Sequence, residues 1–264
     1  MRGTKLAFHT AVGMSLLLAC GAAAAKNIEC DVDSDFDLTI NEQSVILTRS
    51  HGTQAPKAIV MRQGRLFVDD AWVKLSAADS RRIAEYEQQA RATMPIAQQI
   101  GRDAADIAFT ALGEVAAGLS SNPKETRADL DKARAKIDQN LAHAISANRF
   151  NGNELGDSIA SAITEVMPLV MGDIVGGAVS AALSGDEARL ERMNNLDKDI
   201  EARVEPRAKK LEKSAEMLCR KMEALDEIDD ALEFRMPDGS RLDLLETKVT
   251  IREDGEGVVI RDKR

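Results

Sequence analysis

The sequence predicts an α+β protein: an N-terminal antiparallel β meander, a central alanine-rich helical bundle with a long amphipathic last helix, and short C-terminal β strands. Three observations support this class. Apolar residues alternate in short runs before residue 75, recur at helical spacing over residues 76–232, and return in short runs beyond residue 232. Because aromatic residues are only 3% of the chain, the core must come mainly from aliphatic side chains on closely packed helices.

Residues 1–25 are typical of an export signal peptide. Arg2 and Lys5 make a positive start, an apolar run covers residues 7–19, and small residues follow it. We therefore expect a mature chain that begins near Lys26 and is released into an oxidising compartment.

The same segment allows a second route of processing. Residues 17–21 resemble a lipobox, in which Cys20 would be acylated and would become the first residue of an outer-membrane lipoprotein. Either cleavage leaves Cys30 and Cys219 in the mature chain, so the cysteines do not decide between a soluble and a lipid-anchored protein.

Cys30 and Cys219 are expected to form a disulfide. Thiols are normally bridged in an oxidising compartment, and neither cysteine lies in a CxxC pair that would indicate a redox enzyme. The alternative is a pair of unbridged buried thiols.

Residues 26–75 are predicted to form the β meander. Gln63-Gly64 supplies a tight turn between two of its strands. The strands are expected at residues 36–40, 45–47, 58–61, 65–69 and 72–75.

Residues 76–232 are predicted to be helical. Ser76 and Asp79 resemble a capping box at the start of the first helix, and Pro95 is expected to bend or break that helix. Further helices are expected at residues 126–148, 155–183 and 186–232. The last has apolar residues near heptad spacing, which suits packing in the bundle or the seam of a homodimer.

The segment 155–183 is the most apolar part of the mature chain. Its acidic residues make membrane insertion costly, so we expect it to pack in the helical region. A small-residue face on it is a possible partner-binding surface, and if that face is buried its smallness reflects packing alone. The face consists of Gly172, Gly176, Gly177 and Ala181.

Residues 233–264 are predicted to be a C-terminal β extension. Strands are expected at 232–236, 242–251 and 258–260, with a turn at residues 237–239. Because Cys219 would be tied to Cys30, we expect these strands to join or cover the N-terminal sheet.

One acidic stretch partly matches a calcium-binding loop. Phe36 stands where such a loop needs glycine, and no helix is predicted on either side, so a solvated strand face explains the same alternation. The carboxylates of this calcium candidate are Asp31, Asp33, Asp35, Asp37 and Glu42.

No catalytic motif is present. The chain contains no HExxH zinc motif, no GxSxG nucleophile elbow and no phosphate-binding loop, so we expect no cofactor and name no catalytic residue. Its net charge of −9 disfavours nucleic acid as a partner. The leading hypothesis is a non-enzymatic protein that binds another component of the cell envelope. The rival is a hydrolase whose carboxylate site only the fold could assemble.

The chain resembles the YggN-like exported proteins of Gram-negative bacteria. The resemblance is carried by Cys30 just after an export signal, residues 65–69 running into residues 73–76, Tyr86, and a late cysteine in a charged helix. It spans roughly residues 30–219. It implies a periplasmic location and supports the cysteine pair, and it transfers no active-site residue.

Overall fold

The fold class predicted from the sequence is confirmed. The computed structural model describes residues 27–49, 55–185, 187–253 and 256–261, and within them the chain forms antiparallel strands, a central set of long helices and C-terminal strands. The predicted signal peptide and Cys20 lie outside the described residues.

The meander forms most of a seven-stranded sheet. Successive antiparallel neighbours are β2 (Asp37–Ile40), β3 (Val45–Thr48), β4 (Ala58–Arg62), β5 (Arg65–Val68) and β6 (Ala71–Trp72). The predicted turn between β4 and β5 has positive φ at Gln63 (53°) and Gly64 (72°). Both amides of this turn donate to the buried carboxylate of Glu87, so the hairpin is fixed to the first helix.

A short hairpin completes this sheet at the edge of β2. The helix predicted over residues 126–148 ends earlier, as α2 (Pro123–Ala144), and is followed by β7 (Ile145–Ser146) and β8 (Arg149–Asn151). Phe150 lies opposite Ile40 in the β2–β8 pairing, and Ile145 is buried. Pairing with a strand more than 100 residues earlier overrides the local helical pattern, which is why the sequence did not show the hairpin.

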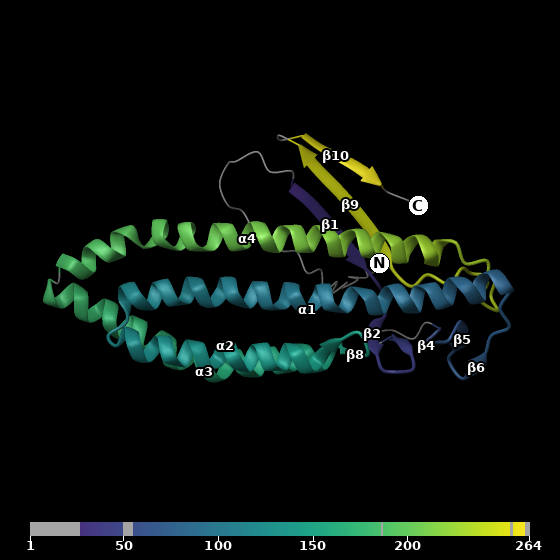
Figure 1. The fold of residues 1–264 in the computed structure, drawn as a ribbon, viewed down its shortest axis with the longest axis horizontal. Coiled ribbons are helices and arrows are strands. Elements are labelled where there is room, and N and C mark those ends of the chain that lie inside the picture. The colour runs from purple at the N-terminus through teal and green to yellow at the C-terminus, as the bar shows by residue number, and fades with distance from the viewer. Residues whose placement is uncertain (1–26, 50–54, 186, 254–255, 262–264) are drawn as a thin grey trace, which may run out of the picture.

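Three long helices build the bundle with α2 (Figure 1). In the view of Figure 1, α1 (Ala77–Leu119) lies between α4 (Glu187–Asp230) above and α2 with α3 (Gly152–Ser184) below. Pro95, Pro168 and Pro206 all lie inside helices, so the break expected at Pro95 does not occur. Burial along the 43 residues of α1 outweighs a local cost of about 3 kcal/mol for an interior proline.

The start of α1 is capped as predicted, but only in part. The Ser76 hydroxyl accepts from the Asp79 amide, at 3.0 Å. The buried Asp79 carboxylate does not complete the box; it accepts from the backbone amide of Glu233 at 3.0 Å and from Arg82 at 2.8 Å. This carboxylate therefore joins the start of α1 to the chain just beyond α4.

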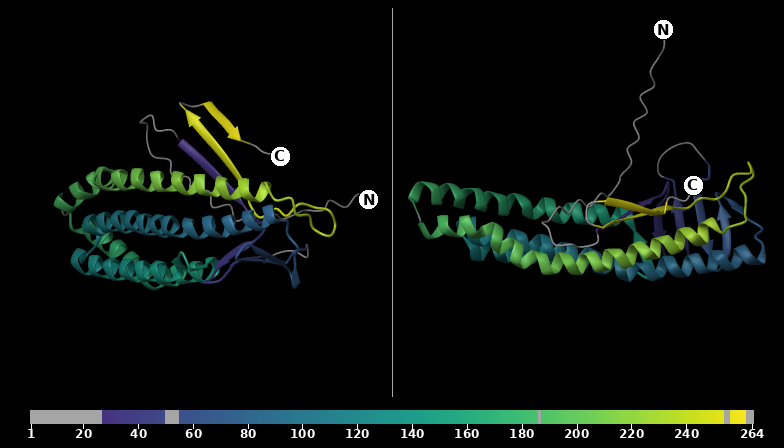
Figure 2. Two further views of the ribbon diagram at one scale, coloured as in Figure 1. Left: turned by 45° about the vertical axis from the view of Figure 1, so that its right-hand side comes forward. Right: turned by 90° about the horizontal axis from the view of Figure 1, so that it is seen from above.

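The last strands form a second sheet with the first strand. β9 (Glu246–Glu253) lies between β1 (Asn27–Asp33) and β10 (Glu256–Arg261), all antiparallel, with Cys30 opposite Val249. This sheet lies against α4 on the side away from α1 (Figures 1 and 2). The strand predicted at residues 232–236 is reduced to one bridge between Arg235 and Arg241, closed by a turn in which Gly239 has a φ of 88°.

One main core joins the seven-stranded sheet, α1 and the end of α4. Its fully buried members on the sheet and on α1 are Ile40, Val45, Ile59, Met61, Leu66 and Ile83. A second, smaller cluster near the other end of α1 contains Ala116, Leu130, Val170 and Ile174.

Replacing both Cys30 and Cys219 with serine should lower the free energy of unfolding. The bridge closes a loop with a sequence separation of 189 residues, and loop entropy predicts a loss of about 5 kcal/mol, an upper figure because the reduced chain keeps some structure. Urea unfolding of the double variant beside the oxidised protein measures the loss. An unchanged midpoint would contradict a stabilising bridge.

Candidate functional site

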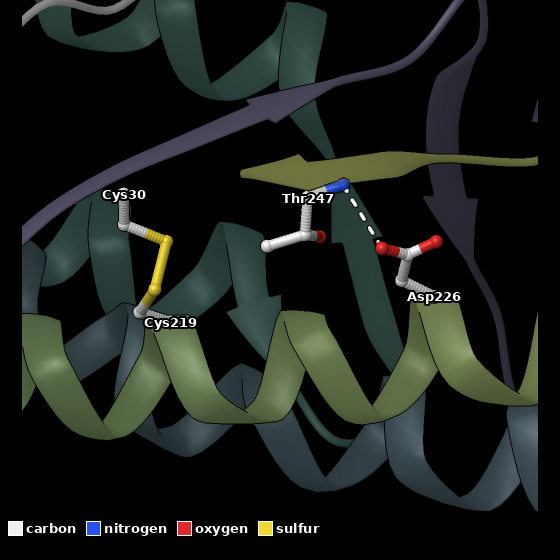
Figure 3. The surroundings of a disulfide bond; sticks show 4 residues. All are labelled: Cys30, Cys219, Asp226 and Thr247. Carbon is white, nitrogen blue, oxygen red and sulfur yellow. Dashed lines mark hydrogen bonds between the residues drawn. A yellow bond between two sulfur atoms is a disulfide. The ribbon is translucent and has the colours of Figure 1, made fainter. Parts of the chain in front are cut away.

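The disulfide fastens the small sheet to α4 (Figure 3). Cys30 on β1 is bonded to Cys219 on α4, with an S–S distance of 2.09 Å and a Cα–Cα distance of 6.0 Å. On the neighbouring strand, the Thr247 amide donates to Oδ2 of Asp226 at 3.1 Å. Two links of different chemistry thus attach the first strand and a C-terminal strand to the same helix.

Asp229, one turn after Asp226, holds the segment that leads into β9. Its Oδ2 accepts from the amides of Leu244 at 2.6 Å and Leu245 at 3.4 Å. The side chain is buried, and this burial raises the pKa of Asp229 to about 7, against the two amide hydrogen bonds, which lower it. Burial, with the charges of Asp229 and Asp226, also raises the pKa of Tyr86.

The five carboxylates of the calcium candidate are divided between the two sheets and the connection between them. Asp31 and Asp33 lie on β1, Asp37 begins β2, and Asp35 between them pairs with Arg49 at 2.5 Å. Glu42 is exposed in the turn after β2. Over the described parts of the chain, no three His, Cys, Asp or Glu side chains are arranged to hold a metal ion.

A cavity of about 240 Å³ lies beside this connection. Its walls include Asp33, Asp35, Arg49, Arg241 and Asp243. Burial raises the pKa of Asp243, as do nearby acidic charges, while Arg241 opposes the shift. Both guanidinium groups have partners already, since Arg49 pairs with Asp35 and Arg241 with Asp230. The cavity is the place where acidic side chains from the two ends of the chain converge.

The inner side of α3 packs along α2 and, at Gly177, against the turn between α1 and α2. Its buried residues are Ala162, Val170, Ile174, Gly177 and Ala181. Gly177 makes the closest approach: a Cβ at this position would lie 1.9 Å from the Leu119 carbonyl oxygen and 2.5 Å from the Ser121 amide nitrogen. No side chain fits between these backbones, so glycine is required here for packing.

Asp173 reinforces the same contact from the neighbouring turn of α3. Its carboxylate accepts hydrogen bonds from the hydroxyls of Ser120 and Thr126, at the start of α2. These two hydrogen bonds lower the pKa of Asp173. One of the acids that made membrane insertion costly therefore has a structural role, because it joins α3 to the end of α1 and the first turn of α2.

The other side of α3 is apolar and exposed. Met171, Val175, Val179 and Leu183 follow one another at four-residue spacing, and they are 46%, 55%, 54% and 84% exposed. Gly172 and Gly176 lie beside this ridge, and they are also exposed. We call these six residues the outer face of α3.

The small-residue surface predicted from the sequence is therefore divided between two sides of the helix. Gly177 and Ala181 belong to the buried side, whereas Gly172 and Gly176 belong to the outer face. The valines and leucine of the ridge were not singled out from the sequence. Their four-residue period was the signal that could have found them.

None of the described helices contains a segment long and apolar enough to cross a membrane.

A family model matches residues 30–245, which is most of the chain, and its description is "Protein of unknown function (DUF2884)". The chain belongs to this family. The match begins at Cys30 and stops before β9, so it includes both bridged cysteines and all four helices. No curated protein and no solved structure matches the chain.

The pKa of Asp229 predicts how stability changes with pH. Between its ordinary value of 3.8 and about 7, the folded state binds a proton that the unfolded state does not, so the free energy of unfolding rises as the pH falls through this range. The slope contributed is up to about 1.4 kcal/mol per pH unit. Chemical unfolding across this pH range measures the free energy of unfolding of the protein and of Asp229→Asn. The slope should be present in the protein and absent in the variant, which lacks the carboxyl group. Parallel curves would contradict this.

Gly177 and Gly176 provide a matched pair of substitutions. Gly177→Ala should destabilise the protein by about 1–3 kcal/mol, because its methyl group meets the Leu119–Ser121 backbone. Gly176→Ala should be neutral or stabilising by up to about 1 kcal/mol, because its nearest neighbour, Ser121 Oγ, is at an ordinary 3.8 Å and alanine favours helix. Thermal unfolding of both variants tests the assignment, and equal losses would contradict it.

Proposed function

We propose that the protein is exported to the periplasm and acts there as a non-enzymatic binding or structural protein of the cell envelope. The observation that carries the proposal is the outer face of α3. Its four large apolar side chains are about half exposed or more, and they are contiguous at one end of the bundle. A row of exposed aliphatic side chains on a helix is typical of a surface that another protein covers.

The chemistry of the outer face favours one kind of partner. Residues 174–184 include no charged side chain, and the exposed glycines allow a close approach of backbone to backbone. An uncharged helix of another polypeptide is therefore the partner that fits, because it would leave no charge desolvated and unpaired.

Two features support export. A disulfide is characteristic of oxidising compartments, and residues 1–25 have the pattern of a signal peptide. The alternative of a lipid anchor on Cys20 would place the same fold at the outer membrane. The intact mass of the protein from cell envelopes distinguishes the two, because only the anchored form begins at an acylated Cys20.

One observation favours a different function, a hydrolase with a carboxylate site. Asp33, Asp35 and Asp243 share one cavity, and Asp243 has a raised pKa. A carboxyl group with a raised pKa close to other carboxyl groups is a common feature of sites for acid–base catalysis. The binding role is preferred because Asp35 is already paired with Arg49.

Photo-crosslinking in intact cells tests the binding role. A photoreactive residue at Val179 should form a crosslink to another polypeptide, because this position is 54% exposed on the outer face. Met217 on α4 is 51% exposed and provides the matched control, which should give no such product. Crosslinks of equal yield at both positions, or at neither, would contradict the proposal.

A further inference from the structure

We infer that the polypeptide that packs on the outer face of α3 is a second copy of this chain, in a two-fold symmetric contact between two α3 helices. This inference rests on the proposed function and names its partner. Three observations support it: the shape of the outer face, the absence of charge on it, and the burial of apolar residues of α4 within the bundle.

The outer face carries both halves of a helix–helix contact. Met171, Val175, Val179 and Leu183 form a ridge along the four-residue row, and the exposed residues Gly172, Gly176 and Ser180 form a shallow row beside it. Ridges of this kind pack into such grooves at a crossing angle of about −50°. A two-fold contact requires that one surface supply ridge and groove together, and the outer face does so.

The described part of the chain does not fill the groove. A Cβ at Gly172 would meet no atom within 4 Å, and one at Gly176 would have Ser121 Oγ as its nearest neighbour, at 3.8 Å. By contrast, the neighbouring Gly177 is in close contact with the α1–α2 turn. The open space beside Gly172 and Gly176 therefore lies on the same side of α3 as the exposed ridge.

The charge of α3 is compatible with a second copy. No charged residue occurs over residues 174–184, although 30% of the chain is charged. The nearest charge, Asp173, accepts hydrogen bonds from Ser120 and Thr126 of its own chain. In a contact that crosses near Gly176, the next acidic residue along α3 is Glu165, which lies about 17 Å from the crossing point at 1.5 Å per residue, so like charges would not meet.

Part of the seam that the sequence suggested for a homodimer, on the last helix, is used within the chain. Leu211, Cys219 and Leu225 of α4 are buried, and α4 packs along α1. Among the described residues, the outer face of α3 has four exposed large apolar side chains, whereas α4 has only Met217, so the outer face is the better surface for self-association. Since one helix per copy buries less than the roughly 1,600 Å² of a standard interface, we expect a dimer that dissociates on dilution.

Sedimentation equilibrium over a wide range of protein concentration tests the inference. The protein should approach twice its monomer mass at high concentration. Val179→Glu should weaken the dimer at least tenfold, because the contact would bury two unpaired carboxylates. Leu183→Glu, at the most exposed position of the ridge, should do the same, while the control Met217→Glu should leave the dimer unchanged. Circular dichroism confirms that each variant is folded.

The outcomes separate this inference from the proposed function. A dimer that persists in both ridge variants, or that Met217→Glu weakens equally, would overturn the α3 contact. A protein that stays monomeric while Val179 crosslinks to a different polypeptide in cells would overturn the second copy and retain the binding role. A monomer without a Val179-dependent crosslink would overturn both.

Discussion

The packing of α1 on several sides organises the whole fold. This helix has α4 along one side and α2 along another, and its first half also covers the meander through Ile83, Tyr86 and Ala90. An isolated helix of this length with an internal proline would be broken, but packing on several sides makes one continuous rod the state of lowest free energy. The helices α2 and α3 and the strands β4, β5 and β7 contact this rod, β1 and β9 contact α4, and the remaining strands are positioned through their neighbours.

Both ends of the described chain are joined to α4, and carboxylates form several of these links. Asp226 and Asp229 on α4 accept backbone amides from the segment that enters β9, while Asp79 at the start of α1 accepts the amide of Glu233. Backbone donors outside regular structure must find acceptors, and buried carboxylates satisfy them at the cost of raised pKa values such as that of Asp229. The disulfide adds a covalent link between β1 and α4.

The two sides of α3 show how one apolar sequence can serve two purposes. On the inner side, Gly177 and Asp173 fit the α1–α2 turn so closely that both residues are explained by packing. On the outer side, no described part of the chain accounts for four exposed aliphatic side chains. An exposed ridge of this kind lowers solubility, and we propose that it is covered by a partner in the cell.

The fold class, the β4–β5 turn, the cap at Ser76 and the cysteine partners could be predicted from the sequence, because these depend on local periodicity, on residue type, or on there being only two cysteines after residue 25. Three features could not be predicted in this way: β7 and β8 join the meander, the prolines leave their helices continuous, and Gly177 is buried while Gly176 is exposed. All three have one cause. Contacts between residues far apart in sequence supply more free energy than the local preference they override, and a pattern read along one segment contains no information about what packs against it.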